Sequence, residues 1–100
     1  MYELTCRYDT RKSFYGKARV FEYDLTDLKL IELISYSTNV AYIKIYKNGE
    51  KKYVYHGYYS QTTTRHQKEF FKQNGLNDDE IKKLFKEGVL RKWDIIKSKA

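Results

Sequence analysis

The chain has 100 residues, of which 41% are hydrophobic and 17% aromatic, and a formal net charge of +7. This length and composition exclude a disordered chain and suit a single domain with one modest core. The positive charge excludes an acidic mimic of nucleic acid and favours an anionic partner, and the single cysteine excludes an internal disulfide.

The N-terminal third of the chain predicts three strands. Residues 2–9 alternate as the first strand, in which Cys6 is expected as a small buried apolar residue. A charged turn at 10–13 leads to a second alternating strand at 18–23. Residues 28–36 form a third stretch, apolar and β-branched, for which a short helix is the alternative.

The clearest strand signal is a hairpin around the Asn-Gly pair at 48–49, the preferred pair for a two-residue type I′ turn. With that pair as the turn, Ile43 lies opposite Val54, and the aliphatic face of the hairpin packs on the core. The other face is then a mosaic of tyrosine and lysine side chains: Tyr42, Lys44, Tyr46, Lys51, Tyr53 and Tyr55.

A first helix is predicted over about residues 63–74, where the sequence is charged and amphipathic. Thr64 and Gln67 fit a capping box at its start. Ser60 or Thr62 would instead cap the helix one turn earlier.

A second helix is predicted to start at Asn77, whose side chain would form a capping box with Glu80, and to end at Gly88. The segment that follows, residues 89–96, is either a last strand or a helical turn. Trp93 is expected to anchor this segment to the body of the protein.

Together these elements predict an α+β fold, an antiparallel sheet of about four or five strands with a C-terminal helix pair packed against it. Nothing in the composition divides the chain, so residues 1–100 are expected to form a single domain. Its parts are residues 1–59, mainly sheet, residues 60–88, a helical hairpin, and residues 89–100, a C-terminal segment. A DNA-binding helix-turn-helix is less favoured, because Phe71 stands where that motif requires a small side chain.

Three stretches of the chain stand out: RKSFYGKA (11–18), SYSTNVA (35–41) and YSQTTTRHQKEFFKQNG (59–75). Together they resemble a family of small uncharacterised proteins from phages and prophages of Gram-positive bacteria, which carries a domain-of-unknown-function label. The resemblance covers about residues 7–76, and the order of the stretches agrees. Thr64 and Gln67 depart from the family pattern, which has apolar residues at both positions.

The resemblance implies a phage-type accessory protein made in the cytoplasm of a bacterial host, and it supplies no catalytic residues. Small phage proteins of this size include inhibitors of host defence, such as anti-CRISPR proteins. The sequence has no apolar run near the ~18 residues of a membrane span, and its start does not resemble a signal peptide. We therefore expect a cytoplasmic protein without a membrane partner.

Few residues could carry catalysis or bind a metal. The two histidines are His56 and His66, and a Ser60 or Thr63 hydroxyl near His66 is better explained as a helix cap. The spacing offers no third group to orient the base, as nucleophilic catalysis requires. A metal site needs three or four convergent ligands, which the pattern does not supply. We therefore expect no enzyme activity, cofactor or metal.

The candidate surface for a partner combines the tyrosine and lysine mosaic with Arg65 on the first helix and three lysines on the second, Lys82, Lys83 and Lys86. Three interpretations of the mosaic remain open: a solvated sheet face, a protein-binding surface, or a platform on which nucleic-acid bases stack. The free N–H groups of a helix start, together with Arg65, would suit a phosphate. The sequence predicts a non-enzymatic protein that binds a host protein or nucleoprotein. Direct nucleic-acid binding is the alternative, and the oligomeric state is left open.

Overall fold

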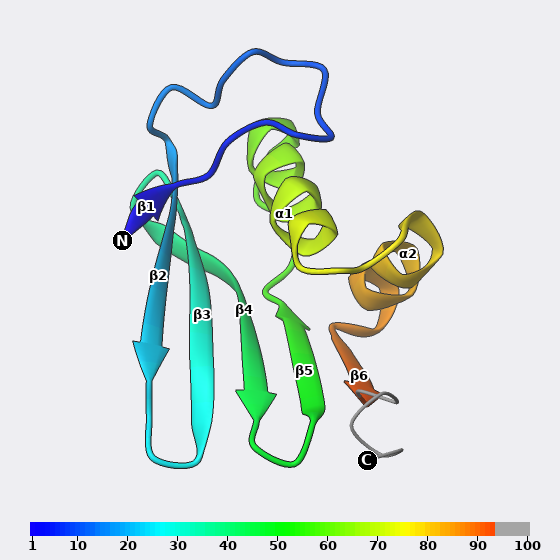
Figure 1. The fold of residues 1–100 in the computed structure, drawn as a ribbon. Helices are drawn as coiled ribbons and strands as arrows, with labels where there is room; N and C mark the ends of the chain where they lie inside the picture. The colour runs from blue at the N-terminus through cyan, green and yellow to red at the C-terminus, as the bar shows by residue number, and fades with distance from the viewer. Residues whose placement is uncertain (94–100) are drawn as a thin grey trace.

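A computed structural model of the chain describes residues 1–93. Six strands form one antiparallel sheet in the order β1-β2-β3-β4-β5-β6, so each strand pairs with its neighbours in the sequence (Figure 1). The strands are β1 (Tyr2–Glu3), β2 (Ala18–Asp24), β3 (Leu28–Ser35), β4 (Thr38–Tyr46), β5 (Glu50–Tyr55) and β6 (Val89–Trp93).

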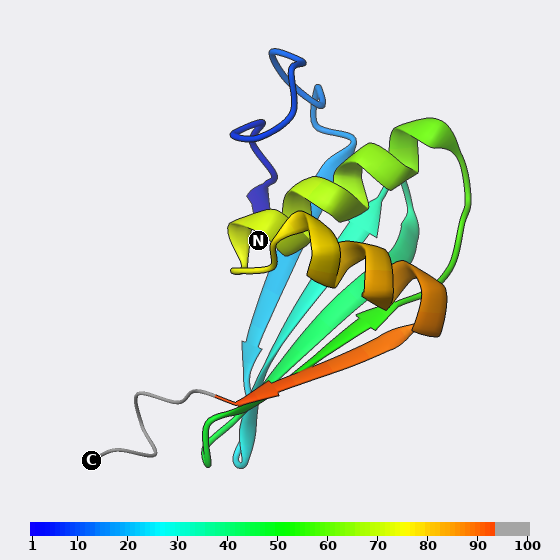
Figure 2. The same cartoon turned by 90° about the vertical axis from the view of Figure 1, so that its right-hand side faces the viewer.

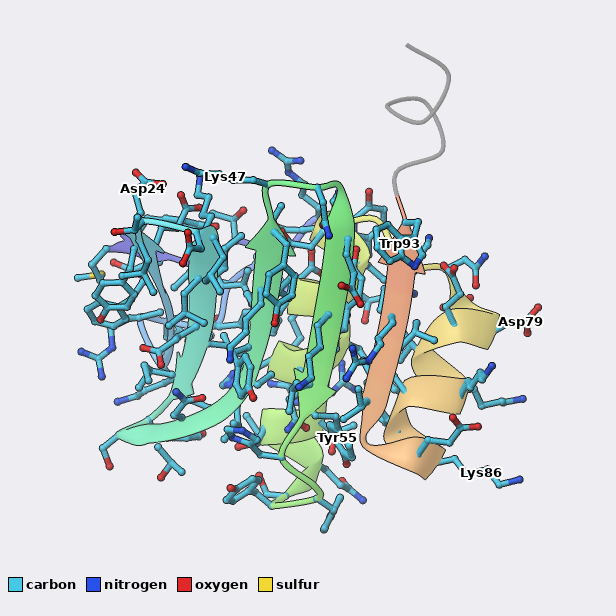
Figure 3. All side chains as sticks on the ribbon, turned by 90° about the horizontal axis from the view of Figure 1, so that it is seen from below. Asp24, Lys47, Tyr55, Asp79, Lys86 and Trp93 are labelled. Atoms are coloured by element: carbon cyan, nitrogen blue, oxygen red, sulfur yellow. The ribbon has the colours of Figure 1, made fainter. Side chains whose placement is uncertain are left out.

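Two helices, α1 (Gln61–Gln73) and α2 (Asp78–Glu87), cover one face of this sheet (Figure 2). Side chains from both layers form the core, and the largest apolar ones that are fully buried include Leu33, Ile43, Phe70, Phe71 and Leu84. The predicted α+β class and the packing of the helix pair on the sheet are confirmed, with six strands where about four or five were expected. Figure 3 looks onto the opposite side of the sheet, here called the open face, with α1 behind the strands and α2 beside β6. No helix or strand within residues 1–93 covers the open face (Figures 2 and 3).

The hairpin between β4 and β5 has a three-residue loop at 47–49, not the two-residue turn that was predicted. Gly49 has a φ of +97°, which glycine adopts without strain. A three-residue loop with glycine at this position changes the register by one residue, so that Ile43 lies opposite Tyr53 rather than Val54. Because alternate residues of a strand point to opposite faces, the predicted faces of β5 are exchanged.

The start of α1 lies one turn earlier than the capping box predicted. Ser60 is the N-cap, and its hydroxyl accepts the N–H of Thr63 at 3.1 Å. The box between Thr64 and Gln67 is therefore wrong, and Gln67 is instead fully buried. The earlier cap, named as an alternative, is the one that the chain uses.

The start and end of α2 agree with the sequence prediction. Asn77 and Glu80 form both hydrogen bonds of a capping box, and Gly88 ends the helix in the left-handed conformation. Of the two structures predicted for residues 89–96, a strand or a helical turn, the chain forms the strand, β6. The last part of that prediction, residues 94–96, lies outside the described residues. Trp93 does not anchor β6 to the core, because its side chain is 59% exposed.

The first predicted strand is much shorter than expected. Only Tyr2–Glu3 pairs with β2, and the chain then leaves the sheet and passes beside α1 before returning at Ala18 (Figure 1). Cys6 lies in this segment and is half-buried against the core. The third stretch forms strand β3 and not the alternative helix.

Candidate functional site

The tyrosine and lysine mosaic predicted for the hairpin is not one surface. Three of its residues face the helices and three lie on the open face: Lys51, Tyr53 and Tyr55 in the first group, and Tyr42, Lys44 and Tyr46 in the second. The one-residue change of register between β4 and β5 is the reason. The prediction that all six residues share a surface is therefore wrong.

Tyr53 and Tyr55 hold the helices on the sheet. Tyr53 is 2% exposed, and its hydroxyl donates to the carbonyl of Asn74 at 3.2 Å. Burial, with a smaller contribution from the carboxylate of Glu80, raises the pKa of Tyr53 to about 12. The ring of Tyr55 stacks on that of Phe85, with 4.0 Å between the ring centroids. These contacts leave neither ring free to stack on a nucleic-acid base.

The remaining half of the mosaic is a small polar and aromatic patch on the open face. The Nζ atom of Lys44 lies 5.7 Å from the centre of the Tyr42 ring, within the range of a cation–π interaction. The ring of His56 forms a T-shaped contact with the same tyrosine, with 5.4 Å between centroids. Tyr42, Lys44 and Tyr46 are all only half-buried, so a partner could still contact them.

The predicted basic residues on the two helices lie in different environments. Lys82, Lys83 and Lys86 are exposed on α2, and Lys86 points away from the sheet in Figure 3. None of these three lysines forms an ion pair with any residue in the described part of the chain. Arg65, by contrast, pairs with the carboxylate of Asp9 at 3.0 Å.

A buried carboxylate on α1 holds the segment between β1 and β2. The side chain of Glu69 accepts the backbone N–H groups of Arg7, Tyr8 and Asp9 at 3.0, 3.0 and 2.9 Å. Gln73 adds a fourth hydrogen bond to the same carboxylate. Three backbone donors that converge on one carboxylate fix the path of a segment that has no secondary structure. This contact, called the Glu69 clamp below, explains why the predicted first strand ends early.

The Glu69 clamp places the segment so that it forms one wall of a cleft along α1, the α1 cleft. The cleft has a volume of about 490 Å³ and is lined by Tyr8, Asp9, Thr10, Tyr58, Gln61, Thr64, Arg65, Lys68, Glu69 and Lys72. Tyr8 and Tyr58 are 57% and 68% exposed at its sides. The volume lies in the range typical of ligand-binding sites.

Sequence reasoning included only Arg65 among the residues of the α1 cleft. A signal for the others exists, because Gln61, Thr64, Lys68 and Lys72 recur at the spacing of one helix face. No sequence signal connects that face to Tyr8 and Tyr58. Tyr8 lies far from it in the sequence, and Tyr58 lies in the irregular loop between β5 and α1. Their position depends on the Glu69 clamp and on the loop between β5 and α1.

His66, the histidine weighed as a general base, is fully buried. Its Nδ1 atom lies 2.8 Å from the Ser35 hydroxyl, which lies 2.9 Å from the hydroxyl of Thr63. Burial lowers the pKa of His66 to about 4, so the imidazole is neutral near pH 7. Ser60, the other candidate nucleophile, caps α1. The hydroxyls near His66 therefore make structural hydrogen bonds inside the protein.

Within residues 1–93, no group of three or more His, Cys, Asp or Glu side chains is arranged to hold a metal ion. No helix among these residues has the length and apolar character needed to cross a membrane. No curated protein and no solved structure matches the chain. A family model does match, over residues 2–87, and it describes a family of unknown function, DUF8033. The chain therefore belongs to this uncharacterised family.

Proposed function

We propose that this chain is a non-enzymatic accessory protein of a Gram-positive phage or prophage, which acts in the host cytoplasm by binding a host protein or nucleoprotein. Inhibition of a host defence system, as by an anti-CRISPR protein, is one form that this activity would take. The proposal rests on the α1 cleft, and the three sequence stretches that suggest a phage family support the biological setting.

The observation that carries the proposal is the pairing of exposed tyrosines with cationic side chains in one preorganised cleft. Tyr8 and Tyr58 offer large rings that cost little conformational entropy to bury, and tyrosine is enriched among residues that dominate protein interfaces. Lys68 lines the same cleft, forms no ion pair with any described residue and favours an acidic segment of the partner. Arg65 and Lys72 also line the cleft, but they are paired with Asp9 and Asp78. Because the Glu69 clamp fixes the wall of the cleft, little ordering is needed on binding.

The test compares Tyr58→Ala with the matched control Tyr23→Ala, which removes an exposed tyrosine from β2. Each purified variant is immobilised and exposed to nuclease-treated and untreated extracts of a Gram-positive host. We expect wild type and Tyr23→Ala to retain one stoichiometric partner, and Tyr58→Ala to weaken its binding by at least about tenfold.

Retention after nuclease treatment would identify a protein, and loss after the treatment would identify a nucleoprotein. Two results would count against the proposal. One is that no stoichiometric partner is retained by the wild type, and the other is that both tyrosine variants retain the partner equally.

Direct nucleic-acid binding is the second candidate, and the observation that favours it is the exposed set Lys82, Lys83 and Lys86 on a chain of net charge +7. Tyr53 and Tyr55 no longer support it, since both pack under the helices. If the lysines bind phosphates, changing all three to glutamine lowers oligonucleotide affinity and reduces its salt dependence by about three in log–log slope. Absence of binding at low salt would eliminate this candidate.

A further inference from the structure

A second pocket, called the His66 pocket here, is lined by a later part of the segment that forms the wall of the α1 cleft. It has a volume of about 240 Å³ and is lined by residues of three segments. Arg11, Ser13, Phe14, Tyr15 and Lys17 come from the segment between β1 and β2, Tyr36 from the turn after β3, and Thr62 and His66 from α1. These are the same three stretches that stand out in the sequence, although they are far apart along the chain.

The innermost residue of this pocket, His66, has a polar atom without a partner. Its Nδ1 atom lies within hydrogen-bond distance of the Ser35 hydroxyl, and its ring forms a T-shaped contact with Phe14 at 4.6 Å between centroids. The Nε2 atom is buried and has no hydrogen-bond partner among the described residues. When Thr63 donates to Ser35 and Ser35 donates to Nδ1, the neutral imidazole carries its proton on Nε2. His66, which lines the pocket, then has a buried donor that requires an acceptor.

The charged side chains that line the pocket are basic, so they favour an acceptor that is an anion. Arg11 and Lys17 are exposed, and neither forms an ion pair with any residue in the described part of the chain. The pocket lining includes no aspartate or glutamate. Two acidic groups lie close to the lining. Asp9 already accepts the side chain of Arg65 and the backbone N–H of Arg11. The carboxylate of Glu3 lies beside Gly16, between the lining residues Tyr15 and Lys17.

The first turn of α1 adds to this positive potential. The helix has 13 residues and no acidic residue in its first turn, and Thr62 from this turn lines the pocket. The N-terminal end of a helix carries partial positive charge and attracts anions. Hydroxyl groups from Ser13, Tyr15 and Tyr36 supply further polar contacts around the opening.

We propose that the His66 pocket binds the phosphate group of a monoester. In this arrangement Arg11 and Lys17 neutralise the charge, and Thr62 and the Nε2–H of His66 donate hydrogen bonds to phosphate oxygens. The volume exceeds that of a phosphate, which leaves room for the esterified group between the rings of Tyr15 and Tyr36. This site goes beyond the proposed function, because it shares no lining residue with the α1 cleft.

The test is a titration of the folded chain with inorganic phosphate and with phenyl phosphate, followed by NMR of the His66 imidazole and the backbone amides. We expect saturable shifts at His66 Nε2 and at the Thr62 amide, and phenyl phosphate should bind at least as tightly as inorganic phosphate. The variants Arg11→Gln and Lys17→Gln should each weaken binding by about tenfold. Lys12→Gln is the matched control, because it makes the same charge change at an exposed lysine that does not line the pocket.

Three results would overturn the proposal. The first is the absence of a saturable shift at His66. The second is that Lys12→Gln lowers the phosphate affinity as much as Arg11→Gln does, which would indicate non-specific electrostatic attraction. Weaker binding of phenyl phosphate than of inorganic phosphate would exclude a monoester. The two proposals fail separately, since Tyr58→Ala should leave phosphate binding unchanged and Lys17→Gln should leave partner retention unchanged.

Discussion

The two helices lie side by side on the sheet but are held by different kinds of interaction. The ends of α2 are set by residues next to them in the sequence, through the capping box of Asn77 and Glu80 and the left-handed Gly88. In α1, polar side chains from the middle of the helix form hydrogen bonds with residues that are distant in the sequence. Local rules are therefore sufficient to predict α2, whereas α1 depends on contacts that form only in the folded protein.

The buried polar residues of α1 show why its sequence is misleading. His66, Gln67 and Glu69 occur in a charged stretch that is typical of a solvent-exposed helix face, yet each is at most 2% exposed. Each forms hydrogen bonds with another segment, which offset part of the cost of burying it. The Nε2 atom of His66 and the Oε1 atom of Gln67 are buried without a hydrogen-bond partner among the described residues. Predictions about these residues test whether α1 is held in this way and α2 is not.

The largest expected effect is that of Glu69→Ala, which removes the acceptor for the N–H groups of Arg7, Tyr8 and Asp9. We expect the free energy of unfolding to fall by roughly 4 kcal/mol, because several charge-assisted hydrogen bonds are lost together. Urea denaturation followed by circular dichroism measures the change. Lys68→Ala, at the exposed neighbouring position, is the control and should stay within about 0.5 kcal/mol of the wild type. Equal effects of the two variants would contradict the clamp.

The next effect concerns the pH dependence of stability. The pKa of His66 falls from 6.5 in the unfolded chain to about 4 in the folded protein, mainly through burial, with Arg11 lowering it further and Asp9 opposing. Below pH 6.5 the unfolded state binds the proton first, so stability decreases as the pH falls from about 6.5 to about 4. The total loss should be about 3 kcal/mol.

Denaturation curves at several pH values test this, with His66→Gln as the comparison. The variant lacks the titrating group, so the part of the slope between pH 6.5 and 4 that belongs to His66 should disappear even if the variant is less stable throughout. The same slope in both proteins would show that His66 titrates normally in the folded state.

The third prediction concerns Gln67, whose amide donates to the carbonyls of Val40 and Gly57 at 3.0 and 3.1 Å. Gln67→Leu keeps a similar volume but leaves both carbonyls without this donor. We expect a loss of about 2 kcal/mol in the free energy of unfolding, measured by thermal or urea denaturation. An unchanged or higher stability would mean that the apolar residue of the family pattern is compatible with this chain as well.

The strands show the same division between local and distant information. The three stretches at 18–23, 28–36 and 39–46 were recognisable because their apolar residues recur at the spacing of a strand. Which face of β5 packs on the core was not predictable. An Asn-Gly pair suits both a two-residue turn and a three-residue loop in which glycine has positive φ. Only the packing of Tyr53 under the helices distinguishes the two registers.

The candidate sites were the least predictable part of the molecule. Arg65, Lys82, Lys83 and Lys86 were recognised as candidates from charge and helix position alone. The α1 cleft and the His66 pocket require the segment between β1 and β2 to pass beside α1, and that path is set by hydrogen bonds between residues about sixty positions apart. Periodicity describes a single element, so it carries no information about such contacts.

The smallest expected effects come from the caps, and they test the two helices on equal terms. Ser60→Ala removes the acceptor for the Thr63 N–H in α1, and Asn77→Ala removes the acceptor for the Glu80 N–H in α2. Each variant should lower the free energy of unfolding, measured by urea denaturation, by about 1 kcal/mol, because one backbone N–H at the helix start loses its acceptor in the protein and is bound only by water. Hydrogen exchange should distinguish the two variants. Asn77→Ala should speed exchange only near the start of α2. Ser60→Ala should leave the centre of α1 protected, because Gln67 and Glu69 still hold it. Rapid exchange throughout α1 in Ser60→Ala would mean that its cap, and not its distant contacts, holds the helix.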